Sequence, residues 1–291
     1  MYYNVDMKNY RETYVRKAEI AQLILLHQIY SLSGSQELIF QGGTALRWCY
    51  GGSRFSEDLD FVTPLSADDV RAKLNRTLNA VEREMVPHFG PGALTLSDKS
   101  TRPDTLKLFA DYRPAASREK ISVKLEFEGI RKEILPETKN HILSALPAVS
   151  YLIASGDFRV PRPNAVLVVE TLPEILSDKI RALLERRYLK GRDIFDIWYL
   201  RAVLNAAAGK EMIERKFRMY AWPFQPARNL DFFADPSSAA QEEMKTVIRE
   251  DLARFLPQEL LAVHQAEGYA SFLTAIKSLF AELRKKEVAL P

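Results

Sequence analysis

Two aspartates separated by one residue give the strongest chemical signal in the chain. The stretch Asp58-Leu59-Asp60-Phe61-Val62 alternates polar with apolar residues over most of its length, as a half-buried strand does. Residues two apart in a strand point to the same face, so Asp58 and Asp60 would present two carboxylates side by side. Magnesium prefers such hard oxygen ligands, and a pair of metal ions can activate an attacking hydroxyl and stabilise a leaving pyrophosphate. The pair therefore predicts a magnesium site.

A glycine turn precedes this strand and supplies the other half of a nucleotide site. Gly42-Gly43-Thr44 follows the short apolar run 38–40, and a helical composition resumes at residues 45–48. Without side chains, glycines let backbone N–H groups at a helix N-terminus approach phosphate oxygens closely. We expect Gly42 and Gly43 to hold a triphosphate, with the Thr44 hydroxyl assisting. Alone, each feature is explained by a tight turn or a solvated edge strand, but their order favours nucleotide chemistry.

A third carboxylate would complete a site for two metal ions. Residues 121–128 alternate apolar with polar side chains, which predicts a strand with one buried face. Glu126 lies on the polar face and is our candidate for the third metal ligand. Glu128 shares that face and stays open as an alternative.

The elements that must position these residues predict an α/β (α+β) first domain, residues 1–170. A helix of about 11–32 has its apolar residues within one arc, and strands are expected at 38–40, 58–62, 121–128 and 166–169. Another helix opens at Ser66 and runs to about Met85. These segments favour a mixed sheet flanked by helices.

Residues 171–291 predict a mainly helical second domain. Thr171 can cap a helix, Pro173 suits its first turn, and Glu174 stands three residues after the threonine. Helical composition covers 174–188, 192–207, 238–255 and 262–286, as in a bundle.

Composition excludes several classes of protein. The 291 residues are 47% hydrophobic and 27% charged, so the chain is not globally disordered. Its apolar runs fall short of the roughly 18–20 residues that a membrane span needs, and the first 25 residues lack a secretory signal, so we expect a cytoplasmic protein. The single Cys49 and four scattered histidines indicate neither a disulfide nor a zinc site, and Cys49 has no paired histidine that would make it a nucleophile.

Positive charge is concentrated in one segment. The net charge is only +3, but residues 179–218 contain eleven Lys/Arg against five Asp/Glu, a local balance of +6. We expect a phosphate-rich partner to dock there.

The glycine turn and the aspartate pair stand in blocks that resemble a known family. Residues 41–46 and 52–61 are similar to the signature of the AbiEii/AbiGii-type nucleotidyltransferases, toxins of abortive-infection and related toxin–antitoxin pairs in the DNA polymerase β-like superfamily. Residues 172–180 and 190–200 resemble the family's lysine and Arg-Asp-x-x-Asp blocks. The resemblance covers about 38–200 and leaves the last ninety or so residues unmatched.

The resemblance implies roles for particular residues of this chain. Asp58 and Asp60 would be the catalytic pair, Lys179 would contact a nucleotide phosphate, and Asp193 would be an essential acid. Ser56, in the second block, is a further candidate for nucleotide binding. Lys179 and Arg186 lie seven apart on one helical face and could reach one anion, although solvated cations are the alternative. Asp193 could also simply favour the helix dipole or pair with Arg192.

The hypothesis that follows is a magnesium-dependent nucleotidyltransferase toxin that consumes a nucleoside triphosphate. By the resemblance, its acceptor is an RNA, a tRNA 3′ end, and its partners include a cognate antitoxin. Glu126 or Asp193 would take the acceptor's proton. Two alternatives stay open: an enzyme of the same superfamily that modifies a protein or a small molecule, and a nucleotide-binding module without turnover.

Overall fold

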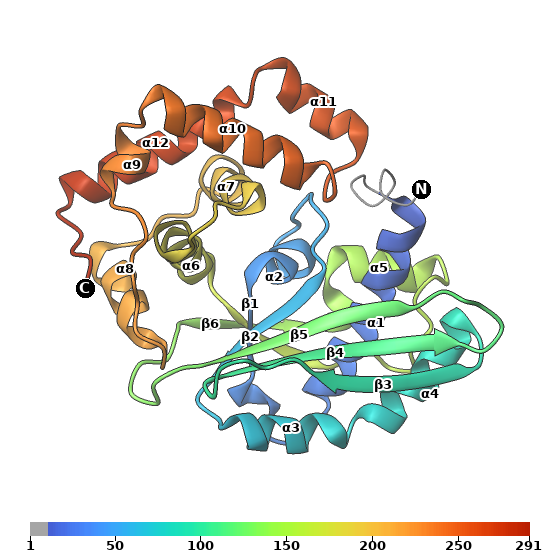
Figure 1. Cartoon of the computed structure of the whole chain (residues 1–291). Helices are drawn as coiled ribbons and strands as arrows, with labels where there is room; N and C mark the ends of the chain where they lie inside the picture. The colour runs from blue at the N-terminus through green and yellow to red at the C-terminus, as the bar shows by residue number, and fades with distance from the viewer. Residues whose placement is uncertain (1–10) are drawn as a thin grey trace. The chain divides into compact units, whose positions relative to one another are not determined.

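The computed structural model describes residues 11–291, and residues 1–10 of the predicted first domain lie outside the described residues. The chain divides into two compact units, one of Thr13–Glu170 and one of Thr171–Pro291 together with Arg11 and Glu12. Figure 1 shows the sheet of the first unit and the helices of the second.

The first unit is built on a mixed seven-stranded sheet in the order β3-β4-β5-β2-β1-β7-β6. The pairs β2/β5 and β1/β7 are parallel and the other pairs are antiparallel. The predicted mixed sheet flanked by helices is therefore confirmed. The strands are β1 (Ile39–Gln41), β2 (Asp58–Thr63), β3 (Gly92–Asp98), β4 (Thr105–Pro114), β5 (Ile121–Gly129), β6 (Thr138–Ile142) and β7 (Val166–Glu170).

Alternation along β2 and β5 separates an apolar face of the sheet from a charged one. Phe61 and Phe127 are fully buried on the apolar face, with their rings stacked at 4.7 Å, and Tyr30 of α1 packs against Phe61. The helix α2 contacts β1 and β2, and in Figure 1 it lies on the other side of the sheet from α3. The helices of this unit are α1 (Glu12–Tyr30), α2 (Gly42–Cys49), α3 (Ala67–Asn75), α4 (Leu78–Phe89) and α5 (Pro147–Ala154).

The helix predicted from Ser66 to Met85 is two helices. Ser66 caps α3, because its Oγ accepts a hydrogen bond from the Asp69 N–H at 3.1 Å. The break falls at Thr77, whose hydroxyl donates to the main-chain oxygen of Leu74 at 2.7 Å and so competes with the helical hydrogen bonds. The sequence pattern of one apolar face continues across this break, so periodicity alone missed it. The edge strand β6 and the helix α5 were also missed.

The second unit is helical, as the composition predicted. Its helices are α6 (Leu172–Glu185), α7 (Gly191–Trp198), α8 (Lys210–Met219), α9 (Asp231–Ala234), α10 (Ser238–Leu252), α11 (Gln258–Ala266) and α12 (Ala270–Lys285). The predicted helix 192–207 ends earlier, since α7 passes into a π-helix, Tyr199–Val203. The predicted helix 262–286 is wrong as one element, because Gly268 and Tyr269 both have positive φ and separate α11 from α12. No helix within residues 11–291 is long and apolar enough to span a bilayer.

The start of α6 is held by a buried ionic cluster and not by the predicted cap. Thr171 occupies the N-cap position without a capping hydrogen bond from its side chain. Glu174 is fully buried and pairs instead with Lys216 of α8 at 2.9 Å, and Lys216 also lies 2.9 Å from Asp178. Arg215 is a further partner of Glu174. These pairs tie α6 to α8 across the unit's interior.

We expect Lys216→Met to lower the free energy of unfolding by about 3–5 kcal/mol, because it leaves Glu174 and Asp178 buried with less compensating charge. Lys277→Met is the matched control, since Lys277 is exposed on α12, and its effect should stay within about 0.5 kcal/mol. Urea unfolding followed by circular dichroism measures both. Equal stability of the two variants would contradict a stabilising role for the cluster.

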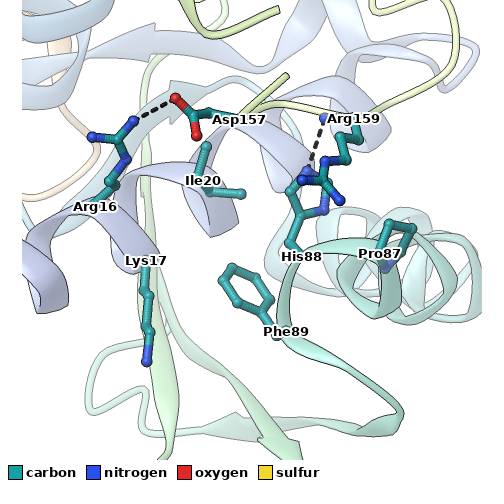
Figure 2. A pocket seen from close by; sticks show the side chains of 8 residues that line it. All are labelled: Arg16, Lys17, Ile20, Pro87, His88, Phe89, Asp157 and Arg159. Carbon is teal, nitrogen blue, oxygen red and sulfur yellow. Dashed lines mark hydrogen bonds and ion pairs between the residues drawn. The ribbon is translucent and has the colours of Figure 1, made fainter. Parts of the chain in front are cut away.

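A histidine joins α4 to the segment after α5 beside a pocket of about 250 Å³. In Figure 2, Arg16 points toward Asp157 on one side of the pocket and His88 lies beside Arg159 on the other. The His88 Nδ1–H donates to the main-chain oxygen of Glu84 at 3.0 Å, and Nε2 accepts the Arg159 N–H at 2.9 Å. Burial lowers the pKa of His88, so the neutral imidazole that makes both bonds is favoured.

This histidine predicts a loss of stability in mild acid. The unfolded chain takes up a proton at His88 near pH 6.5, whereas the folded chain does so only at lower pH because its pKa is lowered. The free energy of unfolding should therefore fall as the pH drops below about 6.5. Urea unfolding at pH 7.5 and 5.5 should show a larger loss for the wild type than for His88→Gln. An equal loss in both proteins would refute the assignment.

Candidate active site

The parallel register of β2 and β5 sets the charged side chains of the first unit in two rows. Asp58 pairs with Lys124 and Asp60 pairs with Glu126. Paired residues on neighbouring strands point to the same face, as do residues two apart on one strand. Four charged groups therefore share the face of the sheet opposite Phe61.

Lys124 lies between two of the carboxylates predicted to bind metal. Its Nζ is 2.7 Å from Asp58 Oδ2 and 2.8 Å from Glu126 Oε2. Lys107 of β4 approaches Glu126 from the other side, with 3.4 Å between Nζ and Oε1. Lys124 had no predicted role, although its position two residues before Glu126 already put it on the same face.

These contacts keep both partners charged. Burial by itself lowers the pKa of Lys124, but the carboxylates of Asp58 and Glu126 outweigh it and hold the pKa above its ordinary value. Burial raises the pKa of Glu126, yet Lys124 and Lys107 together bring it below its ordinary value. An ammonium and a carboxylate are thus the stable forms at neutral pH.

The glycine turn packs directly against the second aspartate. Gly42 begins α2 with a φ of +78°, and a Cβ at this position would lie 2.8 Å from Asp60 Oδ2. A Cβ at Gly43 would meet the guanidinium of Arg54 and lie 2.9 Å from Ser56 Oγ. A side chain at Gly42 would be strained by the positive φ and would press on the Asp60 carboxylate, so the start of α2 lies directly beside Asp60.

The remaining candidates of this block are buried supports of the turn. Thr44 is fully buried, and its hydroxyl donates to the main-chain oxygen of Asp58. Ser56 is buried, and its main-chain oxygen accepts a hydrogen bond from Gln22 at 2.6 Å. Arg54, which the sequence analysis did not assign to the site, is buried beside Gly43. Residue spacing alone did not indicate a buried guanidinium at this glycine turn.

The carboxylates of Asp58, Asp60 and Glu126 are suited to binding a cation, and two of them form ion pairs with Lys124. Among residues 11–291, no three carboxylate, histidine or cysteine side chains converge as metal ligands. The ammonium of Lys124 lies between Asp58 and Glu126 and is the cation that both carboxylates contact. Asp58, Asp60 and Glu126 provide three carboxylates on two neighbouring strands, and such hard oxygen ligands are of the type that magnesium takes.

The second unit brings together its own predicted residues. The Nζ of Lys179 lies 2.9 Å from Asp193 and 2.7 Å from Asp196, and all three side chains are nearly buried. Arg186, at the end of α6, pairs with the second oxygen of Asp193. Lys179 and Arg186 do reach one anion, as their spacing predicted, but here the anion is Asp193. The start of α7 is thereby fastened to α6.

Much of the positive charge of residues 179–218 is neutralised inside the second unit. Arg215 and Lys216 pair with Glu174, and Arg201 pairs with Glu282 at 2.7 Å. The local excess of +6 counted only charges within the segment, and these acidic partners lie outside it. Arg187, in the short link after α6, is exposed. Because the other cations named above are paired with acidic residues, fewer cations of this segment are available to phosphates than its local charge of +6 suggested.

Comparison with known proteins decides the family. Residues 24–285 match the family described as "Nucleotidyl transferase AbiEii toxin, Type IV TA system". The chain belongs to this AbiEii family. The resemblance seen in the sequence is confirmed, and the match extends to residue 285, well into the region that the sequence blocks left unassigned. As a member, the chain is a nucleotidyltransferase toxin of a type IV toxin–antitoxin system, which implies an antitoxin partner.

Two crystal structures from Helicobacter pylori share the fold of this AbiEii protein. One, assigned as a nucleotidyltransferase, has 17% identity and a TM-score of 0.52, with 94% of this chain and 98% of the other covered. The second, JHP933, has 15% identity and a TM-score of 0.53, with 96% of each chain covered. At such identities the similarity shows the fold. A comparison with curated proteins found no match.

Alanine substitutions at two glycines with positive φ, Gly42 and Gly90, should affect nucleotide binding differently. Gly42→Ala should lower the free energy of unfolding by about 1–2 kcal/mol, because alanine is strained at this positive φ. The close contact between the new methyl group and Asp60 Oδ2 should lower it further. Gly90→Ala is the matched control, since Gly90 has a φ of +81° with open space around it. Urea unfolding and titration with a fluorescent nucleoside triphosphate measure both. Gly42→Ala should weaken nucleotide binding while Gly90→Ala leaves it unchanged; equal binding by the two variants would refute the contact.

Proposed function

We propose that this AbiEii protein is a magnesium-dependent enzyme that transfers a nucleoside monophosphate from a nucleoside triphosphate to the 3′ end of a tRNA. The observation that carries the proposal is the β2–β5 register, which aligns Asp58, Asp60 and Glu126 on one face beside the glycine turn. A carboxylate row next to backbone N–H groups provides a place for a divalent cation and for a triphosphate.

Each residue has a defined task in this proposal. Asp58, Asp60 and Glu126 hold magnesium, which when bound neutralises phosphate charge and favours loss of pyrophosphate. Gly42, Gly43 and the N–H of Thr44 receive the triphosphate at the start of α2. Arg54 and Ser56 line the same turn. The triphosphate is thereby oriented with its α-phosphorus open to an acceptor.

The transfer is a displacement at phosphorus. The acceptor hydroxyl oxygen forms a bond to the α-phosphorus, the bond to the bridging oxygen breaks, and pyrophosphate leaves. The hydroxyl proton passes to a carboxylate, for which Glu126 and Asp193 are the candidates.

The helical unit supplies the other roles that the resemblance implies. We propose that Lys179 contacts the nucleotide phosphate and that Asp193 is essential, directly or by holding Lys179. The RNA backbone would meet exposed cations such as Arg187. A tRNA with added 3′ nucleotides cannot be aminoacylated, so translation would stop, and the cognate antitoxin would prevent this in the cytoplasm.

Asp60→Asn should abolish the transfer and leave the fold intact. The variant keeps the shape of the side chain and removes the charge that a metal ion needs, so we expect a loss of more than about 100-fold. The assay incubates the full chain with magnesium, total tRNA and each labelled nucleoside triphosphate in turn. Label should appear on tRNA with the wild type, disappear with a chelator, and return when magnesium is restored.

Asp68→Asn is the matched control, because Asp68 is an exposed residue of α3 that pairs with Arg71 one helical turn away. It should label tRNA at the wild-type rate. Label on the protein itself or on another protein would favour the enzyme that modifies a protein. Unchanged labelling by Asp60→Asn would refute the proposed site, and no label anywhere would favour a binding module.

A further inference from the structure

Lys124 places a positive charge between two carboxylates that are proposed to bind a metal ion. Its ammonium lies between Asp58 Oδ2, at 2.7 Å, and Glu126 Oε2, at 2.8 Å, and only 21% of its side chain is exposed. These are two of the three carboxylates to which the proposed function assigns the metal. The ammonium therefore holds oxygen atoms that a divalent cation would need.

The charge balance explains why a lysine is tolerated there. Asp58, Asp60 and Glu126 carry three negative charges on two neighbouring strands, which would repel one another without a partner. Lys124 and Lys107 offset two of those charges. These five groups together carry a net charge of −1, compared with −3 for the carboxylates alone.

A divalent cation and the ammonium cannot keep the same two oxygens. Magnesium binds carboxylate oxygens at about 2.0–2.1 Å, and two positive charges sharing the same oxygen atoms would repel each other strongly. Lysine, however, is a point charge on a flexible four-carbon stem, so it can leave without moving the strand. An incoming triphosphate offers it new anionic partners on the same face of the sheet.

We propose that Lys124 is a displaceable counter-ion, which holds the cation position between Asp58 and Glu126 in the empty enzyme and moves to the triphosphate when a divalent cation takes that position. The inference rests on the proposed function. Lys124 then positions the nucleotide, and metal and triphosphate enter together because each removes an obstacle for the other.

The test measures binding and not turnover. Mn²⁺, which takes the same oxygen ligands, is titrated into the full-length wild type and Lys124→Met without nucleotide, by calorimetry or by electron paramagnetic resonance of the free ion. A non-hydrolysable triphosphate analogue is then titrated at saturating Mn²⁺. Lys124→Met should bind Mn²⁺ about tenfold more tightly than the wild type and bind the analogue about tenfold more weakly.

Two comparison variants separate this role from a general change in charge. Lys107→Met removes the same charge beside Glu126, but Lys107 does not bridge the two carboxylates, so its effects should be severalfold smaller. Lys120→Met removes a cation paired with Asp111 at 3.1 Å on the same sheet, and both affinities should match the wild type. Asp60→Asn should lose Mn²⁺ binding, which places the ion at this site.

Several outcomes would overturn the inference. Mn²⁺ affinity that is unchanged or weaker in Lys124→Met would show a purely structural pair, and equal effects of Lys107→Met would show a general charge effect. If Lys124→Met fails to fold by circular dichroism, Lys124→Gln takes its place with the same expectations. If the wild type binds Mn²⁺ and Lys124→Met binds it with the same affinity, this inference alone is refuted. If the wild type does not bind Mn²⁺ even in the presence of the analogue, the proposed function is refuted as well.

Discussion

The parallel pairing of β2 with β5 determines which charges meet in this AbiEii protein. Asp58 stands beside Lys124 and Asp60 beside Glu126, and a shift of either strand by one residue would turn its two charged side chains toward the apolar face. Phe61 and Phe127 prevent such a shift, because their stacked and fully buried rings fix the register from the other side of the sheet. The core packing and the chemistry thus depend on the same strand pairing.

The glycine turn depends on that pairing too. Gly42 sits so close to Asp60 that a side chain would displace the carboxylate, and the hydroxyl of Thr44 is tied to the main chain of Asp58. The start of α2 and the aspartate pair therefore form one rigid corner. Rigid positioning of this kind is what phosphoryl transfer requires, since it proceeds mainly by orientation and charge stabilisation.

In the helical unit, several charged side chains form buried ion pairs that join one helix to another. Lys179 is held by Asp193 and Asp196, and Lys216 is held by Glu174 and Asp178. Buried charges of this type are costly unless each has a partner, so the partners constrain how α6, α7 and α8 pack. A count of basic residues along the chain therefore overstates the positive charge that is available to bind a nucleic acid.

The sequence by itself determined the local structure and the family: the alternation of β2 and β5, the glycine turn before a helix, the helical second half and the AbiEii membership. It determined these because side-chain periodicity and turn chemistry act over a few residues. Breaks at Thr77 and Gly268–Tyr269 escaped it, since the apolar pattern runs through them. Only the tertiary structure decided that Lys124 lies between Asp58 and Glu126 and that Lys179 faces Asp193, because strand register and helix packing join residues far apart in the chain.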